Sequence, residues 1–381
     1  MKALTVGGAM IDTIAIIESS RIERMAMSNA DSSFLLMEEG RKTEALEIST
    51  HIGGGAVNAA VSMSRLGFDV STLIKLGQDN RAETILTTLE HEGVSTRWAL
   101  RDNRAPTGAS VLISSHDRNA AVFTFRGVNT MLETSDLHDN AFAVDVIYIT
   151  SLSGRSAERF PDIVRRAKAQ GALVATNPGV RQLSARAGPF QDALRMVDIV
   201  ALNRSEASTL VPSLIAQFGE GGPKLPLAEG EERPDIDKRP LSGGGFDMSV
   251  VQFFRALTSL GPKRVLLTDG KRGAYVATPE EIVFCPSVDC TVAGTAGAGD
   301  AFTSTYTAFE ALGFPPVEAL KAATINAASV VGFVDTQAGL LKREELEKRI
   351  EALGPQFTTR SWPLHFESPD DEREVGEMAA E

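Results

Sequence analysis

Short apolar runs alternate with stretches of helical pattern along most of the chain, and this alternation is the strongest constraint on the fold. The apolar runs lie at Lys2–Gly8, Val70–Leu76, Val144–Thr150, Ala172–Thr176, Val197–Leu202 and Arg264–Thr268, and helical patterns follow several of them, as at Glu158–Ala169, Arg204–Leu210 and Met248–Leu260. Strands that alternate with helices at this spacing form βαβ units, in which helices cover both faces of a parallel sheet. The sequence therefore predicts a three-layer α/β/α domain.

A second pattern interrupts the first. Glu44–His51, Thr107–Ser114 and Ala120–Arg126 alternate apolar with polar residues, and a turn-rich connector joins the last two. Short alternating strands of this kind form a half-exposed sheet. We expect a small β-sheet lid, built from about residues 13–52 and 105–127, that covers a cleft and also pairs with a second copy of the chain as a homodimer.

Charge and cysteine content exclude several classes of function. The 381 residues carry 38 basic and 50 acidic side chains, a net charge of −12, which argues against nucleic acid or an anionic membrane as the main partner. Two cysteines, Cys285 and Cys290, cannot form a disulfide framework or a four-ligand zinc site, so a cytoplasmic location is expected. An anionic ligand is still allowed, because backbone amides bind phosphate without net positive charge.

A loop of small residues, Gly294–Phe302, enters a stretch of helical composition. Such a loop directs free backbone amides at one point, which creates a cradle for phosphate or an oxyanion. Asp300 lies at the start of the helix, where a carboxylate is placed to take a proton from a substrate hydroxyl. The alternative is an ordinary helix start, with Asp300 as a cap and glycines for tight packing.

A second glycine loop, Ile52–Asn58, enters the amphipathic stretch Ala59–Leu66. Gly54 lets a ligand approach the main chain, and the Asn58 amide is placed to hydrogen-bond a polyol. Neither loop matches a P-loop or a dinucleotide-binding fingerprint.

Together the two loops resemble the two signature regions of the ribokinase-like (PfkB) family of sugar and nucleoside kinases. The matching motifs are Gly7–Asp12, Gly53–Asn58 with Arg65–Gly67, Gly77–Asp79, Asn177–Arg181, Asn203–Glu206, Thr268–Ala274 and Gly297–Phe302. They follow one another in family order and span residues 1–353, so the resemblance implies a ribokinase-like domain over that range. Residues 354–381 are expected to form an acidic tail, and Phe218–Phe246 a long flexible insertion.

The resemblance implies roles for individual residues at the acceptor. Asp12, Gly54 and Asn58 match the positions that hold substrate hydroxyls, although Asp12 also suits a strand-end cap. Asp300 matches the catalytic base. The amides of Ala298, Gly299 and Asp300, with Gly297 shaping the turn, match the anion hole for the transferring phosphoryl group. Arg126, at the end of an inserted strand, is placed to close over the substrate, and Arg181 to reach phosphate oxygens; either also suits a solvated surface arginine.

At the nucleotide, the resemblance implies ATP with Mg²⁺. Glu206, paired with Asn203 in an Asn-x-x-Glu motif, matches the residue that organises the metal through water; the alternative is a helix-capping pair. Thr268, Gly270 and Gly273 match the turn that flanks the nucleotide. Asn326 matches a position beside adenine, but an ordinary helix polar residue fits equally well.

Two departures from the family pattern bear on cofactor and substrate. Gly294 replaces the aspartate that begins the second signature and that helps to hold a monovalent cation in many members, so potassium activation is doubtful. Gly55 replaces a frequent lysine, which favours an unphosphorylated acceptor. The favoured substrate is therefore a free sugar or sugar derivative. Alternatives are a nucleoside such as adenosine, with Phe34–Met37 as an apolar wall, and a catalytically silent ligand-binding member.

Overall fold

A ten-stranded sheet forms the centre of the protein in this computed structural model. The structure describes residues 1–18, 23–26, 33–36, 40, 42–115, 120–185, 187–354 and 357–366. The strand order is β18-β17-β16-β15-β12-β11-β10-β1-β6-β7, in which β16 (Ala274–Ala277) pairs antiparallel with both of its neighbours. Seven strands run parallel: β1 (Lys2–Val6), β6 (Asp69–Leu76), β7 (Ala99–Arg101), β10 (Val146–Ile149), β11 (Leu173–Thr176), β12 (Ile199–Asn203) and β15 (Arg264–Thr268). The predicted parallel sheet is confirmed.

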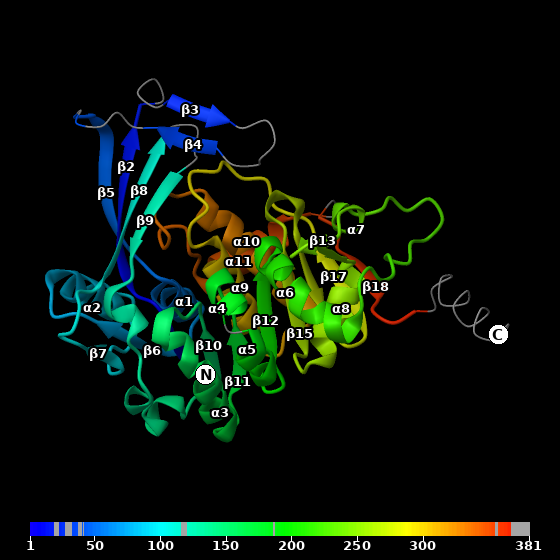
Figure 1. Cartoon of the computed structure of the whole chain (residues 1–381), viewed down its shortest axis with the longest axis horizontal. Coiled ribbons are helices and arrows are strands. Elements are labelled where there is room, and N and C mark those ends of the chain that lie inside the picture. Colours follow the sequence, from blue (N-terminus) through cyan, green and yellow to red (C-terminus); the bar gives the residue numbers. More distant parts are fainter. Residues whose placement is uncertain are drawn as a thin grey trace.

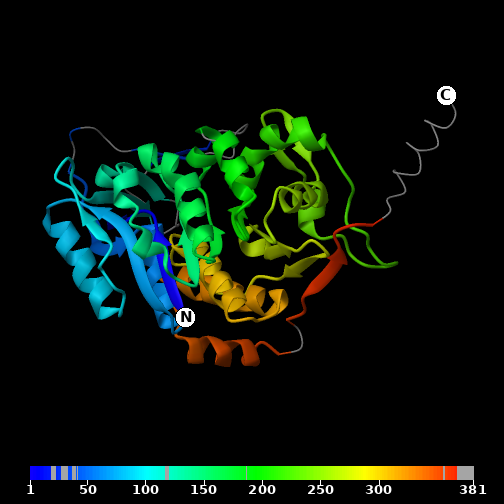
Figure 2. The same cartoon turned by 90° about the horizontal axis from the view of Figure 1, so that it is seen from below.

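Helices cover both faces of this sheet. One face packs against α3 (Phe160–Ala169), α5 (Ala187–Leu194), α6 (Arg204–Phe218) and α8 (Val250–Ser259), and the other against α1 (Gly55–Arg65), α2 (Asn80–His91), α9 (Ala298–Ala311), α10 (Pro316–Val331) and α11 (Arg343–Ala352). Successive strand residues alternate between the two cores: in β10, Ile147 belongs to the first and Tyr148 to the second. The three layers are visible edge-on (Figure 2).

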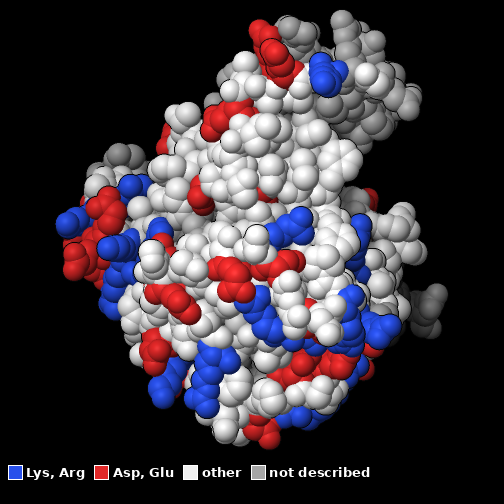
Figure 3. Space-filling model, turned by 90° about the vertical axis from the view of Figure 1, so that its left-hand side faces the viewer, with Lys and Arg blue, Asp and Glu red and all other residues white. Residues whose placement is uncertain are grey.

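A smaller sheet projects from one end of the domain (Figure 1). Its strand order is β5-β2-β8-β9, with β2 (Met10–Ile17) parallel to β8 (Gly108–Ser115) and antiparallel to β5 (Ala45–Gly53), and with β9 (Ala120–Phe125) at the edge. A hairpin of β3 (Glu23–Ala26) and β4 (Ser33–Leu36) lies beyond it. This sheet corresponds to the predicted lid, and the described residues on the side that Figure 3 shows include few charged side chains.

One face of the lid sheet is apolar and exposed. Ile48, Val111, Phe123 and Phe125 are 67%, 43%, 61% and 52% exposed. The strand register places all four on the same side of the sheet, opposite to Asp12. Exposed apolar area of this kind is typical of an interaction surface.

The structure differs from the sequence prediction at the C-terminus. Residues 360–363, assigned to an acidic tail, form β18 (Arg360–Pro363), which pairs antiparallel with β17 (Glu281–Cys285). The Trp362 side chain is 4% exposed, and Leu364 is fully buried. The apolar pattern at residues 360–363 is too short and too close to a run of charged residues to indicate a strand. Burial of the Trp362 and Leu364 side chains stabilises β18 instead.

The insertion predicted to be flexible is also packed. It contains α7 (Asp235–Lys238) and a hairpin of β13 (Leu241–Gly243) and β14 (Phe246–Met248) that lies on α6. Leu225, Ile236 and Leu241 are at most 2% exposed and join the core. Within the described residues, no helix is long and apolar enough to cross a membrane.

Replacing Trp362 should destabilise the protein, since this side chain is buried and its Nε1 donates to Glu231 Oε1 at 3.2 Å. We expect Trp362→Ala to lower the free energy of unfolding by about 3 kcal/mol, measured by urea denaturation. Phe246→Ala, which truncates an aromatic that is 40% exposed, is the control. Equal effects of the two changes would show that β18 does not contribute to the fold.

Candidate active site

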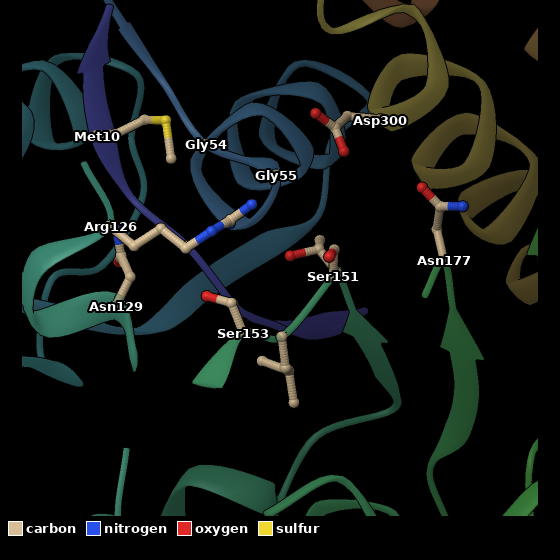
Figure 4. Close-up of a pocket in the computed structure, with 13 residues that line it drawn as sticks. Met10, Gly54, Gly55, Arg126, Asn129, Ser151, Ser153, Asn177 and Asp300 are labelled. Carbon is tan, nitrogen blue, oxygen red and sulfur yellow. The ribbon is translucent and has the colours of Figure 1, made fainter. Parts of the chain in front are cut away.

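A cavity of about 240 Å³ opens where the carboxyl ends of the parallel strands meet the base of the lid. Ligands bind at this edge of parallel α/β sheets because helix starts and loops converge there. Its lining residues come from the turn after β1, the start of α1, the end of β9 and the loops after β10 and β11, with Asp300 from α9: Gly7, Gly8, Met10, Gly54, Gly55, Arg126, Asn129, Thr150, Ser151, Leu152, Ser153, Asn177 and Asp300. Figure 4 shows the side chains converging on this space.

Gly54 fixes the start of α1 against the turn after β1. Its φ is +98°, and a Cβ there would come within 2.5 Å of the Gly8 carbonyl oxygen. Only glycine combines this backbone conformation with such a close approach. The predicted ligand-facing role of Gly54 is compatible with its place in the cavity wall.

The start of α9 presents free backbone amides beside Asp300. Gly297 precedes the helix with a φ of +78°, and its Cβ position is occupied by Thr336. The first turn of a helix leaves its amide groups without intrahelical acceptors. Of the three predicted cradle amides, that of Ala298 donates to the Thr295 carbonyl at 3.4 Å, and those of Gly299 and Asp300 have no acceptor among the described residues.

Asn58 holds Asp300 in position. Its Nδ2 donates to Asp300 Oδ2 at 2.9 Å, while its Oδ1 accepts from Thr336 Oγ1 at 3.0 Å and from Gln337 Nε2 at 3.2 Å. Burial raises the pKa of the Asp300 carboxyl, and the Asn58 hydrogen bond opposes this in part. Asn58 is 3% exposed and is not part of the cavity wall, so its contacts here are with protein rather than with the space for a substrate.

Glu206 is the second acidic group near Asp300. Its Oε2 accepts from the Asn203 backbone at 2.9 Å, and Asn203 Oδ1 accepts from the Glu206 backbone at the same distance, which makes the pair a capping box at the start of α6. Burial raises the pKa of Glu206 to about 7, against the hydrogen bonds from Asn203 and Asn177, and the negative charge of Asp300 adds to the rise. The predicted capping alternative is thus present, and it does not exclude a role near a metal.

Asp12 lies on the lid face opposite to the exposed apolar one, in one row with His51 and Ser110. Ser110 Oγ donates to Asp12 Oδ1, and burial raises the Asp12 pKa despite this hydrogen bond and the charge of His51. His51 Nδ1 contacts Asp335 Oδ2 at 3.0 Å, which links β5 to the turn that contacts Asn58. Asp12 is adjacent to the cavity wall but not part of it.

The residues predicted for the nucleotide lie along the same sheet edge but outside the cavity wall. Thr268 ends β15, and Gly270 and Gly273 follow with φ values of +57° and +97°. Asn326 is fully buried: its Nδ2 donates to Thr305 Oγ1 at 2.7 Å and its Oδ1 accepts from the Leu341 backbone at 2.9 Å. The Asn326 amide is therefore committed to internal packing.

Two residues of the site received no role from the sequence. Asn177 follows β11 directly and donates to the Ala201 carbonyl at 2.9 Å and to Glu206 at 3.4 Å; its place after an apolar strand was a usable signal. Asn129 holds both polar atoms of the Ala9 backbone, at 3.0 and 2.8 Å, and nothing in its local sequence marked it. The side chains of the proposed apolar wall, Phe34–Met37, lie outside the described residues.

This chain belongs to the pfkB family of carbohydrate kinases, whose family model matches residues 21–343. Relatives in this family are named ribokinase and deoxyribokinase, which are phosphotransferases with an alcohol group as acceptor. The chain is therefore a member of the ribokinase family of sugar and nucleoside kinases. It is 24% identical over 282 residues to the bifunctional ribokinase/ribose-5-phosphate isomerase A of Fructilactobacillus sanfranciscensis, with 72% of this chain and 46% of that protein covered. It thus spans about half the length of that relative.

Other similar proteins match over nearly their whole length. Ribokinase from Staphylococcus aureus is 22% identical over 296 residues, covering 76% of this chain and 85% of that protein. The structure of Arabidopsis thaliana ribokinase complexed with ribose and ATP superposes with a TM-score of 0.67 at 19% identity, over 92% and 98% of the two chains. Burkholderia thailandensis nucleoside kinase in complex with inosine superposes with a TM-score of 0.67 at 16% identity, over the same shares. These likenesses establish the ribokinase-like fold.

The pKa of Glu206 predicts a pH-dependent stability. Because the folded-state pKa of about 7 lies above the ordinary value of 4.5, Glu206 binds more protons in the folded state between these two values, and stability falls as pH rises through this window. In ligand-free protein, the free energy of unfolding of Glu206→Gln should rise by about 2 kcal/mol relative to that of the unmodified chain as the pH is raised from 5 to 8. Urea denaturation at both pH values measures this. A difference between the two proteins that does not change with pH would contradict it.

Proposed function

We propose that this protein transfers the γ-phosphate of ATP to a hydroxyl of a sugar or sugar derivative, with Asp300 as the general base. The observation that carries the proposal is the Asp300 carboxylate in the wall of the cavity, next to the open amides at the start of α9. A raised pKa makes the Asp300 carboxylate a better proton acceptor near neutral pH. The amides of Ala298, Gly299 and Asp300 would stabilise charge on the transferring phosphoryl group.

The donor set suits a phosphate-bound Mg²⁺. When bound, Mg²⁺ would neutralise charge on the phosphates, and it keeps most of its waters. Glu206 and Asn203 are placed to orient such waters. Burial raises the pKa of both Glu206 and Asp300, and the charge of Asp300 raises that of Glu206 further, so the two carboxylates form a site that gains from a nearby cation. Cys285 and Cys290 are both free thiols, which fits a cytoplasmic protein.

The cavity favours a sugar over a nucleoside. Its volume of about 240 Å³ is below the roughly 300–1,000 Å³ typical of pockets for larger organic ligands. Ser151, Ser153 and Asn177 line it with groups that suit hydroxyls, and none of its described lining residues is aromatic. A nucleoside is the second candidate, since a nucleoside kinase shares the fold.

Replacing the proposed base tests the reaction. Asp300→Asn should lower kcat for ADP release about a hundredfold or more, because the amide cannot accept the hydroxyl proton, while ATP binding is retained. The coupled assay uses Mg-ATP with pentoses, hexoses, sugar acids and nucleosides, with and without potassium. Asp247→Asn, at an exposed position on β14, is the matched control. Full activity of Asp300→Asn would show that Asp300 is not the general base. If the unmodified protein binds ATP but releases no ADP with any acceptor, a ligand-binding protein would be favoured.

The exposed apolar face of the lid is the surface through which we expect a homodimer. In a symmetric dimer the same surface is covered on both copies. The apolar patch that contains Ile48, Val111, Phe123 and Phe125 would then be removed from water on each of them. Phe123→Asp should convert the dimer to a monomer in sedimentation velocity, because a carboxylate would be buried without a partner. Phe246→Asp provides the control, and a monomeric unmodified protein would contradict the assembly.

A further inference from the structure

Arg126 is an arginine without a counter-charge in the cavity wall. It lies directly after β9, where the lid joins the domain, and its side chain is half-buried. Among the described residues, its guanidinium has neither an ion-pair nor a hydrogen-bond partner. Figure 4 shows the side chain extending from the lid side across the cavity, while Asp300 and Asn177 enter from the other side. A surface arginine would instead turn toward solvent.

The backbone that carries Arg126 is fixed. Gly127 has a φ of +50°, and an added Cβ there would come within 2.0 Å of the Pro106 carbonyl oxygen. The Val128 backbone donates to the same carbonyl at 3.1 Å, and the Asn129 side chain holds Ala9. The direction in which Arg126 leaves the main chain is therefore set by its neighbours.

A second arginine acts on the first through its charge. Arg181, near the start of α4 (Val180–Ala185), follows the cavity residue Asn177 by one turn of chain and is exposed. Burial lowers the pKa of Arg126, and the positive charge of Arg181 lowers it further; no carboxylate offsets either effect. Arg181 too lacks an ion-pair partner among the residues that the structure describes. A half-buried guanidinium that a second one repels is unfavourable until an anion lies against it.

We propose that the acceptor carries an anionic group, a carboxylate or a phosphate, which Arg126 binds inside the cavity, with the charge of Arg181 adding to the attraction. The inference rests on the proposed kinase function and specifies its substrate class. Guanidinium is the side chain best suited to pair with either group in a two-pronged contact. With the anionic end at Arg126, the opposite end of a monosaccharide-sized molecule lies toward Asp300, as a hydroxyl that is to be phosphorylated requires. This reverses the expectation from Gly55 that phosphorylated acceptors are disfavoured, and adds sugar acids.

Binding measured without ATP separates this inference from the reaction. Isothermal titration of the full chain would compare two matched pairs: D-gluconate with D-glucitol, and D-ribose 5-phosphate with D-ribose. At least one anionic member should bind about tenfold or more tightly than its neutral partner, with a preference that weakens in high salt. The pair that shows the preference identifies the carboxylate or the phosphate as the group recognised. No preference in either pair, including no binding at millimolar concentration, would overturn the proposal.

Variants assign the preference to the arginines. Arg126→Gln should weaken binding of the anionic probe about tenfold to a hundredfold and leave the neutral probe unchanged, and Arg181→Gln should act in the same direction with a smaller effect. Arg195→Gln is the control, because this exposed arginine precedes β12 and so lies toward the amino ends of the parallel strands, whereas the cavity lies at their carboxyl ends. If Arg126→Gln weakens ATP but not the anionic probe, the arginine serves the nucleotide and the proposal fails. ADP release with a neutral sugar, together with no preference for either anionic probe, would sink this inference and leave the kinase function standing.

Discussion

The buried amide of Asn58 is the contact on which the geometry of the site depends. Asn58 lies on α1 and joins this helix to two other elements. It hydrogen-bonds Asp300 of α9, and it hydrogen-bonds Thr336 and Gln337 of the turn at residues 335–338. A carboxylate next to an apolar core costs free energy unless its hydrogen bonds are made, so one amide both orients Asp300 and reduces the cost of its burial. The same helix secures the turn a second time, because Arg65 Nη1 donates to the carbonyls of Gln337 and Leu340, each at 2.8 Å.

This turn also connects the lid to the site. Asp335 contacts His51 of β5 through its Oδ2, and its Oδ1 accepts from the backbone of Gln337 and Ala338. These hydrogen bonds form a continuous chain from β5 through the turn to Asn58 and Asp300. The lid and the proposed base share one set of hydrogen bonds, which gives the closing of a lid a direct physical route to the reacting group.

Much of the fold could be predicted because its signals are local. The parallel strands are apolar runs, and the glycine loops before α1 and α9 adopt backbone conformations that only small residues allow. β18 and the packed insertion were missed because their order comes from distant partners: Trp362 is held by Glu231 and β17, and Leu225 by the backbone contact with Asp237 and the core. Local pattern carries no record of such contacts.

The candidate site divides in the same way. Asp300 and Glu206 could be identified because each lies at a helix start with a recognisable motif. The Asn58 bridge, the hydrogen bonds between Asn129 and Ala9 and the electrostatic effect of Arg181 on Arg126 could not. Each joins segments that are separated in sequence and is created only by folding. For Asn326 the sequence leaves two alternatives open, a ligand position and an ordinary helix polar residue, and its hydrogen bonds with Thr305 and Leu341 favour the second.

The position of β18 has a consequence for how the chain is made. The main sheet ends with a strand drawn from the last described residues of the chain, paired with a strand that precedes it by more than seventy positions. During synthesis, β17 must therefore wait with one edge unpaired while α9, α10 and α11 emerge from the ribosome, and the apolar surface that Trp362 and Leu364 later cover stays open for the same period. Pairing of β18 therefore completes the sheet, and the growing chain is most prone to aggregation just before β18 is synthesised.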